Sequence, residues 1–309
     1  MIMYTEISFP GLGISLNPST GFTLGGLTIR WYGVVIALGL CLAVLYACRR
    51  SRQFGFQEDD ILDGVLWVTP FAILCARAYY CVFSSDWEKY AANPISCLYI
   101  WEGGLAIYGG VIGAVIGCLV YCRIKKLNVF ALLDLVCLGF LIGQCIGRWG
   151  NFFNREASGE ETGSFLRMGL YHVATGQTVY VHPTFLYESL WNLAGFLLLH
   201  FLSKGRKYDG QTALQYMAWY GAGRAVIEGL RTDSLYIPGT DLRVSQILAA
   251  VGCVVALVIL AVQAVRKQDP ARLFVNRVAA ERALEEQPEE EPAAEKKSLR
   301  ERFQTWLRT

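Results

Sequence analysis

Charged residues are scarce in this chain. Only 17% of its 309 residues are charged and 54% are hydrophobic, whereas a soluble domain usually carries about 25% charged residues. The charges are also clumped, so that several stretches are apolar over about 20 residues, the length that crosses a bilayer core once. The scarcity of charge therefore argues against a soluble protein and favours a multi-pass membrane protein.

Three further absences exclude other classes. The net charge of +2 is too small to indicate a nucleic-acid partner. Residues 1–27 lack a basic segment followed by an apolar run, so no cleavable signal peptide is expected. The ten cysteines lack a metal-ligand spacing such as CxxC, and most fall in apolar segments, where small buried thiols are the commoner interpretation. No metal site is predicted.

Apolar segments predict seven membrane-spanning helices, because a backbone inside a bilayer must satisfy its own hydrogen bonds. The predicted spans are Ile29–Cys48, Ile61–Phe83, Leu105–Cys122, Phe130–Ile146, Phe185–Leu202, Ala213–Leu230 and Val244–Val265. The expected fold class is therefore all-α and polytopic, with residues 1–265 as the membrane domain.

Basic residues in the short loops predict the orientation, since cytoplasmic loops are enriched in Lys and Arg. They follow the first, third, fifth and seventh spans, at Arg49, Arg50, Arg52, Arg123, Lys125, Lys126, Lys204, Arg206, Lys207, Arg266 and Lys267. Because these loops share one side of a seven-span chain, that side is expected to be cytoplasmic. The N-terminus is then outside and the C-terminus cytoplasmic.

Three segments lie outside the predicted spans. Residues 1–28 and 148–183 are long outer-face segments, and the second contains a short extended stretch at Gln177–Val181. Residues 266–309 are a charged cytoplasmic tail, expected to be partly disordered. The last residues, 299–307, have the spacing of a helix lying on the membrane surface, although a solvated helical end fits as well.

Glycines recur every four residues in the third and fourth predicted spans, at Gly109, Gly113, Gly117, Gly139, Gly143 and Gly147. Small residues at this spacing allow helices to approach closely in a membrane. Plain packing is therefore the favoured interpretation, and a glycine-lined cavity wall is the alternative.

Ionisable residues occur inside or beside the spans, at Arg77, Arg148, Arg224, Glu228 and Arg231. An ionised side chain at mid-bilayer costs about 2.5–3.5 kcal/mol on insertion scales, so such residues usually line a polar cavity. Arg224, Glu228 and Arg231 share one helix face by their spacing. One carboxylate among three or four guanidiniums predicts a site for an anion such as phosphate; a structural ion pair with snorkelling arginines is the alternative.

The chain leaves the fourth span through a polar stretch, residues 147–159, which reads GRWGNFFNREASG. Its Arg, Asn and Glu side chains supply donors and acceptors suited to a polyol phosphate headgroup, and its glycines permit tight turns. A turn that satisfies its own backbone is the alternative interpretation.

The same stretch resembles the signature of the prolipoprotein diacylglyceryl transferase family. Other stretches that resemble family motifs occur before and after it in the expected order along the chain, at residues 29–33, 76–80, 101–110, 182–188 and 223–231. The resemblance covers about residues 5–265 and leaves the tail outside.

The resemblance implies an enzyme of lipoprotein biosynthesis in the bacterial cytoplasmic (inner) membrane, with its active site toward the outer leaflet. Such a transferase moves the diacylglyceryl group of phosphatidylglycerol to the thiol of a lipobox cysteine in a preprolipoprotein and releases glycerol-1-phosphate. Its partners are phosphatidylglycerol, preprolipoprotein signal peptides and the bilayer, and no metal or organic cofactor is expected.

Roles for individual residues follow from the resemblance. Arg148 and Arg224 would hold the donor phosphate and stabilise charge on the leaving group, with Glu228 positioning Arg224. The remaining residues expected to bind phosphatidylglycerol are Asn151, Asn154, Glu156, Gly159, Tyr32, Arg77 and Arg231.

Tyr108 is expected at the active site, where some family members have a histidine. A tyrosine with a pKa of about 10 is a poor base for a thiol near pH 7. His182, Glu156 and Glu228 are alternative bases, although His182 before Pro183 is favoured as a structural turn residue. A positive field that lowers the thiol pKa would remove the need for a dedicated base.

Three rival functions differ in what they require. A transporter or channel for anionic solutes would also use intramembrane arginines, but without chemical change. A retinal-type pump or receptor needs a lysine inside a helix, and the predicted spans contain none. Another lipid-modifying enzyme with the same donor would differ only in its acceptor.

Overall fold

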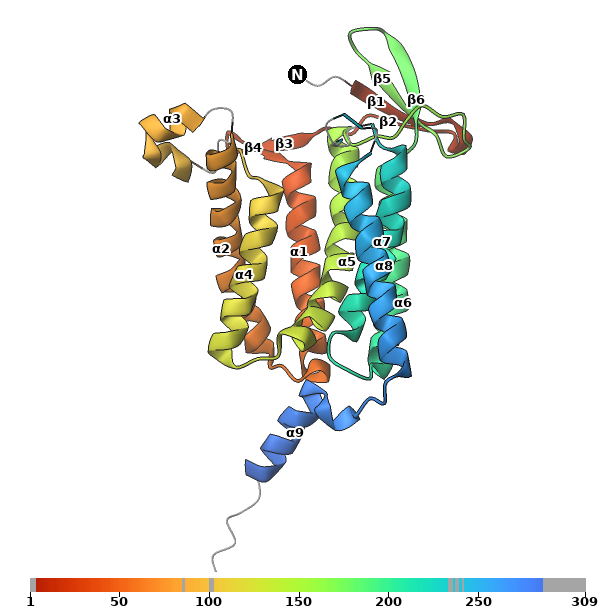
Figure 1. The fold of residues 1–309 in the computed structure, drawn as a ribbon. Coiled ribbons are helices and arrows are strands. Elements are labelled where there is room, and N and C mark those ends of the chain that lie inside the picture. The colour runs from red at the N-terminus through yellow and green to blue at the C-terminus, as the bar shows by residue number, and fades with distance from the viewer. Residues whose placement is uncertain are drawn as a thin grey trace, which may run out of the picture.

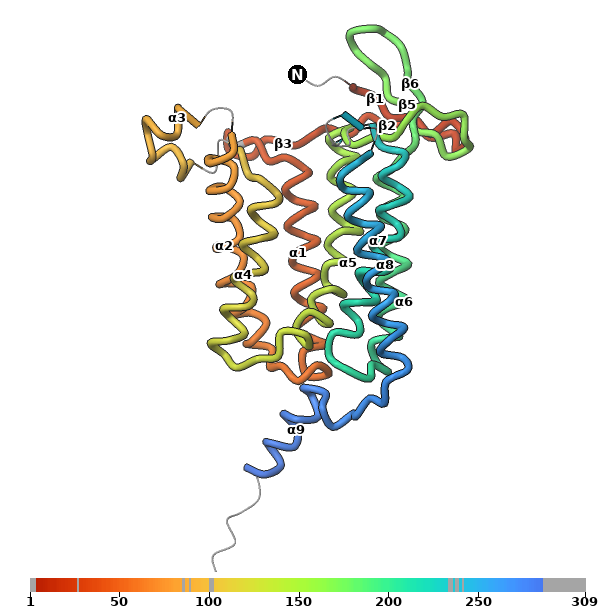
Figure 2. The backbone as a smooth tube through the Cα atoms, viewed as in Figure 1, coloured from red at the N-terminus to blue at the C-terminus, as the bar shows by residue number. Residues whose placement is uncertain are grey.

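A bundle of long helices forms the body of the protein (Figure 1). The computed structural model describes residues 4–84, 87–99, 103–232, 236, 239–240 and 242–285. The long helices are α1 (Trp31–Arg50), α2 (Glu58–Phe83), α4 (Ile107–Lys125), α5 (Val129–Asn154), α6 (Thr184–Leu202), α7 (Gln211–Ile227) and α8 (Val244–Val265). Figure 2 shows α1 between the α2–α4 pair and the group formed by α5, α6, α7 and α8.

Among the described residues, six helices are long and apolar enough to cross a membrane, namely α1, α2, α4, α5, α6 and α8. The prediction of seven spans is therefore confirmed for six. The sixth predicted span, Ala213–Leu230, corresponds to α7, which has only 17 residues and contains Arg224. It continues as a 3-10 turn at Glu228–Leu230. This helix is shorter and more polar than its neighbours, since it contains Arg224 and ends before Glu228.

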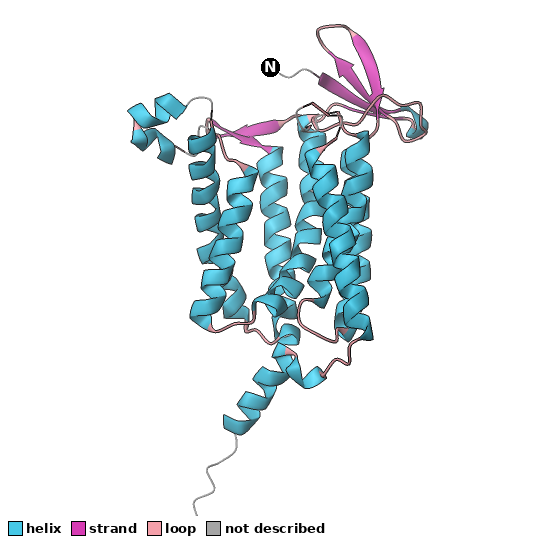
Figure 3. Cartoon of the chain, in the orientation of Figure 1, coloured by secondary structure: helices cyan, strands magenta, loops and turns pink. Residues whose placement is uncertain are grey.

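The prediction of an all-α fold was wrong for the outer segments, which form two small antiparallel sheets (Figure 3). A four-stranded sheet has the order β2-β1-β5-β6, and a hairpin pairs β3 with β4. The strands are β1 (Tyr4–Phe9), β2 (Ile14–Leu16), β3 (Gly21–Leu24), β4 (Leu27–Arg30), β5 (Met168–His172) and β6 (Gln177–Val181). The bounds of β6 confirm the extended stretch expected at these residues.

Residues 4–9 form a strand because their apolar side chains alternate. Ile7 and Phe9 are buried, and they pack with Phe152, Leu170 and Phe185 into a cluster under the four-stranded sheet. A period of two places such residues on one face of a strand. This cluster fixes the sheet onto the ends of α5 and α6, and thereby holds the N-terminal segment over the end of the bundle.

The opposite end of the bundle carries the basic loops and the first part of the tail. Two short helices complete the described chain: α3 (Trp87–Ala92), beside the sheet-side end of α2, and α9 (Phe274–Glu285), at the basic end (Figure 1). Phe274 packs on Phe56, with 5.2 Å between ring centroids. The acidic run from residue 286 and the predicted surface helix at 299–307 lie outside the described residues.

The two glycine stripes differ in how closely they are packed. A Cβ atom added at Gly109 or Gly113 would lie 2.4–2.5 Å from side-chain atoms of α2, whereas one added at Gly143 would meet nothing within 4 Å. The stripe in α4 therefore lets α2 and α4 approach closely, which agrees with plain packing. The stripe in α5 faces α1 at a looser contact.

Two cross-helix interactions hold α7 in place. The carboxylate of Asp134 on α5 is fully buried and accepts hydrogen bonds from Gly210 N (2.8 Å) and Ala213 N (2.9 Å), at the start of α7. Trp191 on α6 and Trp219 on α7 stack at 4.4 Å, and each indole N–H donates to the other's backbone carbonyl at 3.0 Å.

Candidate active site

Glu188, on the first turns of α6, joins three arginines at the sheet end of the bundle. Its Oε2 forms an ion pair with Arg148 Nη2. Its Oε1 lies 3.0 Å from Arg224 Nη1 and 3.4 Å from Arg231 Nη1. The side chain of Glu188 is only 4% exposed, so α5, α7 and the residue that follows the Glu228–Leu230 turn contribute guanidiniums to one buried carboxylate.

A second carboxylate, Glu228, lies beside the first where α7 becomes a 3-10 turn. Its Oε2 is 2.7 Å from Arg224 Nη2 and 4.0 Å from Arg231 Nε. Ser245 Oγ donates to its other oxygen, and Arg243 donates to its backbone carbonyl. Arg224 therefore bridges two carboxylates, and its position is fixed by both.

The charge balance of this group corrects the sequence analysis. The Arg-Glu cluster contains Arg148, Arg224, Arg231, Glu188 and Glu228, which gives a formal charge of +1. The sequence predicts only one carboxylate, Glu228, among the arginines. The second, Glu188, enters the prediction only as the last residue of the family-like stretch 182–188. The sequence feature that points to Glu188 is its place as a single acidic residue in the otherwise apolar span Phe185–Leu202.

A chain of polar contacts leads from the cluster outward. Arg148 Nη1 lies 3.5 Å from Asn151 Oδ1, at the limit of a hydrogen bond. Asn151 and Asn154 each donate to Glu156 Oε1, at 3.1 and 3.2 Å. The polar stretch 147–159 therefore brings four of its predicted site residues together.

The same stretch also satisfies its own backbone, as the alternative interpretation required. Arg155 ends α5 with a left-handed φ of 55°, and Glu156 N donates to Asn151 O at 3.1 Å. The Arg155 guanidinium donates to Thr5 O at 2.8 Å and to Asn17 Oδ1 at 3.2 Å, and burial lowers its pKa. Arg155 thus fastens the N-terminal segment to the end of α5.

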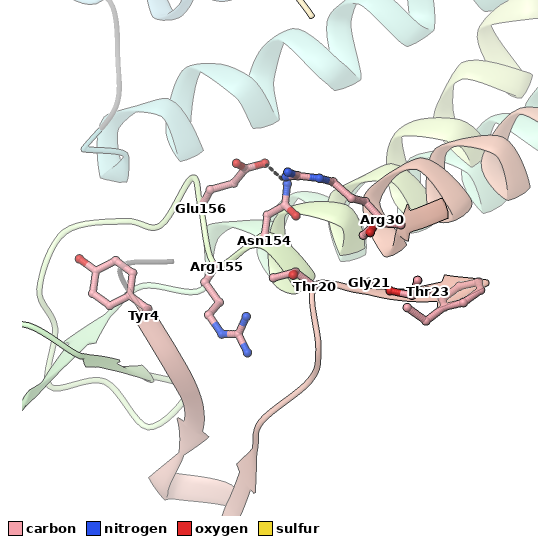
Figure 4. A pocket seen from close by; sticks show the side chains of 10 residues that line it. Tyr4, Thr20, Gly21, Thr23, Arg30, Asn154, Arg155 and Glu156 are labelled. Carbon is pink, nitrogen blue, oxygen red and sulfur yellow. Dashed lines mark hydrogen bonds between the residues drawn. The ribbon is translucent and has the colours of Figure 1, made fainter. Parts of the chain in front are cut away.

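A pocket of about 550 Å³ opens next to this stretch. Figure 4 shows Asn154 and Glu156 at its edge, with Arg30 pointing toward them from β4. Its lining residues are Tyr4, Thr20, Gly21, Phe22, Thr23, Thr28, Arg30, Asn154, Arg155 and Glu156. The pocket is mixed in character, and its polar wall is continuous with the contacts that lead to the cluster.

Two further predicted residues contact the segments that carry the cluster. Tyr32 packs on Gly150, where an added Cβ atom would lie 2.7 Å from Tyr32 Cδ2. Gly159 forms a β-bridge with Arg231 and donates its N–H to His182 O at 3.0 Å. Because an added Cβ atom at Gly159 would lie 2.9 Å from Leu230 O, only glycine allows this close approach.

Arg77 is placed apart from the cluster, and the structure gives it a different set of contacts. Its guanidinium donates to four backbone carbonyls, those of Ser96, Cys97, Gly103 and Gly104. The residue is only 4% exposed. These contacts hold the loop between α2 and α4 in place, so Arg77 has a structural role.

Tyr108 and His182 lie outside the Arg-Glu cluster. Tyr108 is 50% exposed on the first turn of α4, and within the described part of the chain it makes no hydrogen bond or ion pair with the cluster. His182 lies 3.3 Å from Tyr187 OH, and its backbone pairs with Gly159 and Glu160, as expected of a turn residue. Across the described residues, no group of three His, Cys, Asp or Glu is arranged to hold a metal ion.

Known proteins are similar to this chain over the residues that form the site. A family model described as prolipoprotein diacylglyceryl transferase matches residues 19–262. The chain belongs to that family. A phosphatidylglycerol–prolipoprotein diacylglyceryl transferase of Lysinibacillus sphaericus is 42% identical over 256 residues, which cover 79% of this chain and 91% of the relative.

Two other relatives carry the same name. That of Limosilactobacillus reuteri is 43% identical over 263 residues, covering 82% of this chain and 93% of the relative. That of Clostridium novyi is 41% identical over 253 residues, covering 79% and 95%. The match of the transferase family model runs from before β3 to near the end of α8. It therefore includes the whole Arg-Glu cluster and excludes α9.

Proposed function

We propose that this transferase moves the diacylglyceryl group of phosphatidylglycerol to the thiol of a lipobox cysteine in preprolipoproteins, releasing glycerol-1-phosphate. The single observation that carries the proposal is the Arg-Glu cluster. Its excess positive charge suits the phosphodiester of a membrane-resident anionic lipid, and family membership supplies the reaction class.

In the proposed step, the sulfur of the substrate cysteine attacks the terminal glyceryl carbon that is bonded to the phosphate oxygen. A C–S bond forms, the C–O bond breaks, and its electron pair stays on the phosphate oxygen. Arg148 and Arg224 stabilise the charge that grows on that oxygen in the transition state. Glu188 and Glu228 hold the two guanidiniums in place before the reaction, so little reorganisation is needed.

The thiol proton leaves to water or to the product phosphate. The positive field of the cluster favours the thiolate, which is the reactive form. Glu156 and Glu228 are the candidate bases nearest the reacting region, whereas the exposed Tyr108 is better placed to contact substrate from α4. None of the protein's own cysteines takes part.

The placement in the cell is part of the same proposal. Seven crossings, counting α7, would place the sheets and the Arg-Glu cluster at the outer leaflet of the bacterial cytoplasmic membrane. The basic loops and α9 would then face the cytoplasm. Exported lipoprotein precursors emerge on the outer side, where the acceptor thiol would meet the donor lipid. Residues 266–309 form the cytoplasmic tail in this arrangement.

The test uses purified protein, phosphatidylglycerol vesicles and a lipobox peptide, and it measures released glycerol-1-phosphate. Arg148→Ala should reduce release by about a hundredfold or more, as removal of transition-state donors does. Arg167→Ala is the matched control, because Arg167 packs on Tyr180 in the sheet segment. A peptide with serine in place of cysteine should give no release.

The result of this assay distinguishes a transferase from a transporter of anionic solutes. Release by the unchanged protein that disappears with Arg148→Ala, but not with Arg167→Ala, supports the proposal. A folded protein that releases no glycerol-1-phosphate, even in native lipids, would overturn it and favour a transporter of anionic solutes.

A further inference from the structure

One face of the β3–β4 hairpin forms the floor of the pocket beside Glu156. Gly21 pairs with Arg30, and Thr23 pairs with Thr28, and all four residues line the pocket. Residues two apart on a strand share a face. The hairpin therefore presents two threonine hydroxyls and one guanidinium to the cavity. Gly21 allows the two strands to approach closely, because an added Cβ atom would lie 2.4 Å from Ile29 O.

The side chain of Arg30 has no ion pair or hydrogen-bond partner within the described chain, and the residue is exposed and lines the pocket. Figure 4 shows its guanidinium pointing toward Asn154 and Glu156. Arg155, the other arginine in the lining, already donates hydrogen bonds to Thr5 O, Asn17 Oδ1 and Pro18 O. Arg30 is thus the cation in this wall that is available to an anionic ligand.

The polar groups around Arg30 match a particular ligand chemistry. Guanidinium binds phosphate through paired N–H donors, while carboxylate, amide and hydroxyl groups accept from or donate to the hydroxyls of a polyol. Glu156 receives its two side-chain hydrogen bonds on one oxygen, Oε1. A polyol phosphate would satisfy both kinds of group in a pocket of about 550 Å³.

The proposed reaction changes the charge of its phosphate. The donor is a phosphodiester with one negative charge, whereas the released monoester carries about −1.5 to −2 at pH 7. The Arg-Glu cluster, with a formal charge of +1, balances the donor. The product needs a further cation. The contacts from Arg148 through Asn151 end at Glu156, which lines the same pocket as Arg30.

We infer that this pocket binds the leaving glycerol-1-phosphate after C–O cleavage, with Arg30 on its phosphate and Glu156, Asn154 and the threonines on its hydroxyls. The inference rests on the proposed function. It assigns to the hairpin a product site on the way to the outer solution, distinct from the cluster where the bond breaks.

The experiment measures inhibition of the transferase reaction by added glycerol-1-phosphate, for the unchanged protein and for Arg30→Ala and Arg30→Lys. The inhibition constant should rise about tenfold in Arg30→Ala, the loss expected for one charge-assisted contact, and less in Arg30→Lys. It should rise more than the KM for phosphatidylglycerol. Arg167→Ala is the matched control and should behave as the unchanged protein.

The inhibition constant and the two KM values together show which molecule binds in the pocket. Inhibition that stays the same in Arg30→Ala overturns the inference, while the activity itself still supports the proposed function. A rise confined to the KM for phosphatidylglycerol would assign the pocket to the lipid headgroup, and a rise confined to the KM for the peptide would assign it to the acceptor. Either result overturns the product site. Absence of activity in the unchanged protein would instead contradict the proposed function.

Discussion

At the scale of single residues, Glu188 determines whether the arginines can lie together. Without its carboxylate, Arg148, Arg224 and Arg231 would face one another with only Glu228 among them. Like charges at such distances repel strongly where water is scarce. The site therefore depends on a residue that needs no contact with the substrate.

We expect Glu188→Gln to lower kcat/KM by about a hundredfold, because a displacement of catalytic groups by about 1 Å has effects of this size. It should also lower the free energy of unfolding by about 3–5 kcal/mol, the usual cost of removing one partner from a buried ion pair. Release of glycerol-1-phosphate and thermal unfolding in detergent provide the two measurements.

Glu6→Gln is the matched control, since Glu6 accepts from Ser15 on the exposed sheet and lies outside the cluster. Activity of Glu188→Gln equal to that of the control would show that the arginines hold their positions without Glu188.

The sequence predicted most of the cluster because three of its members share one helix end. Helical spacing brings Arg224 and Glu228 together, and Arg231 follows just past the helix end, in a β-bridge with Gly159. Glu188 needed the packing of α6 on α7, which no local pattern encodes. The contacts of Arg77 could not be predicted for the converse reason: its partners are carbonyls of a distant loop, and a carbonyl leaves no sign in the residue type.

At the scale of elements, α7 is anchored at its start by a carboxylate from another helix. Gly210 occupies the N-cap position and has no side chain to accept from the first turn. Asp134 on α5 supplies that acceptor, and its charge suits the positive end of the helix. Since α5 and α7 run in the same direction, the anchor at their starts sets the register of Arg148 and Arg224 at their far ends.

Asp134→Ala should therefore reduce the free energy of unfolding by about 1–3 kcal/mol, the cost of leaving buried donors without acceptors. Asp134→Asn keeps one acceptor and should cost less. Thermal unfolding in detergent measures both, with Asp63→Ala as control because Asp63 lies in an exposed ion pair with Lys125. An unfolding midpoint unchanged by Asp134→Ala would contradict the anchoring role.

The glycine stripes allow a paired test of helix packing. Gly113→Ala should destabilise the protein by about 1–3 kcal/mol, since its methyl group would overlap Cys75 and overpack the α2–α4 contact. Gly143→Ala meets open space and should be neutral or stabilising by up to about 1 kcal/mol through helix propensity. Equal effects of the two changes on the unfolding midpoint would refute the difference in packing.

The element boundaries show where the sequence was informative. Apolar length identified six spans, and the extended stretch expected at Gln177–Val181 corresponds to β6. The N-terminal strands were missed because residues 1–28 are rich in glycine, serine and threonine, which are typical of loops. They are strands because Ile7 and Phe9 find a partner surface on α5 and α6, a long-range contact.

At the scale of the whole molecule, the number of crossings decides which side each end occupies. Seven crossings place the sheet and the tail on opposite sides, whereas six place the N- and C-terminal segments on the same side. The basic loops favour the first arrangement.

We expect alkaline phosphatase inserted between Thr175 and Gly176, in the turn between β5 and β6, to be active in bacterial cells. The same enzyme fused after Glu285, at the end of α9, should be inactive. The reason is that its disulfides form only outside the cytoplasm. Activity from both fusions, with equal amounts of each protein, would argue against an odd number of crossings.

The stacked indoles of Trp191 and Trp219 have a consequence for observing this protein. Two chromophores 4.4 Å apart and nearly parallel couple their electronic transitions, and the coupling depends steeply on their separation. Gly195 and Gly223 leave the space that the two rings fill, so the pair exists only while α6 and α7 are docked. Circular dichroism in the aromatic region therefore offers an intrinsic optical signal for this contact, readable during turnover without any attached label.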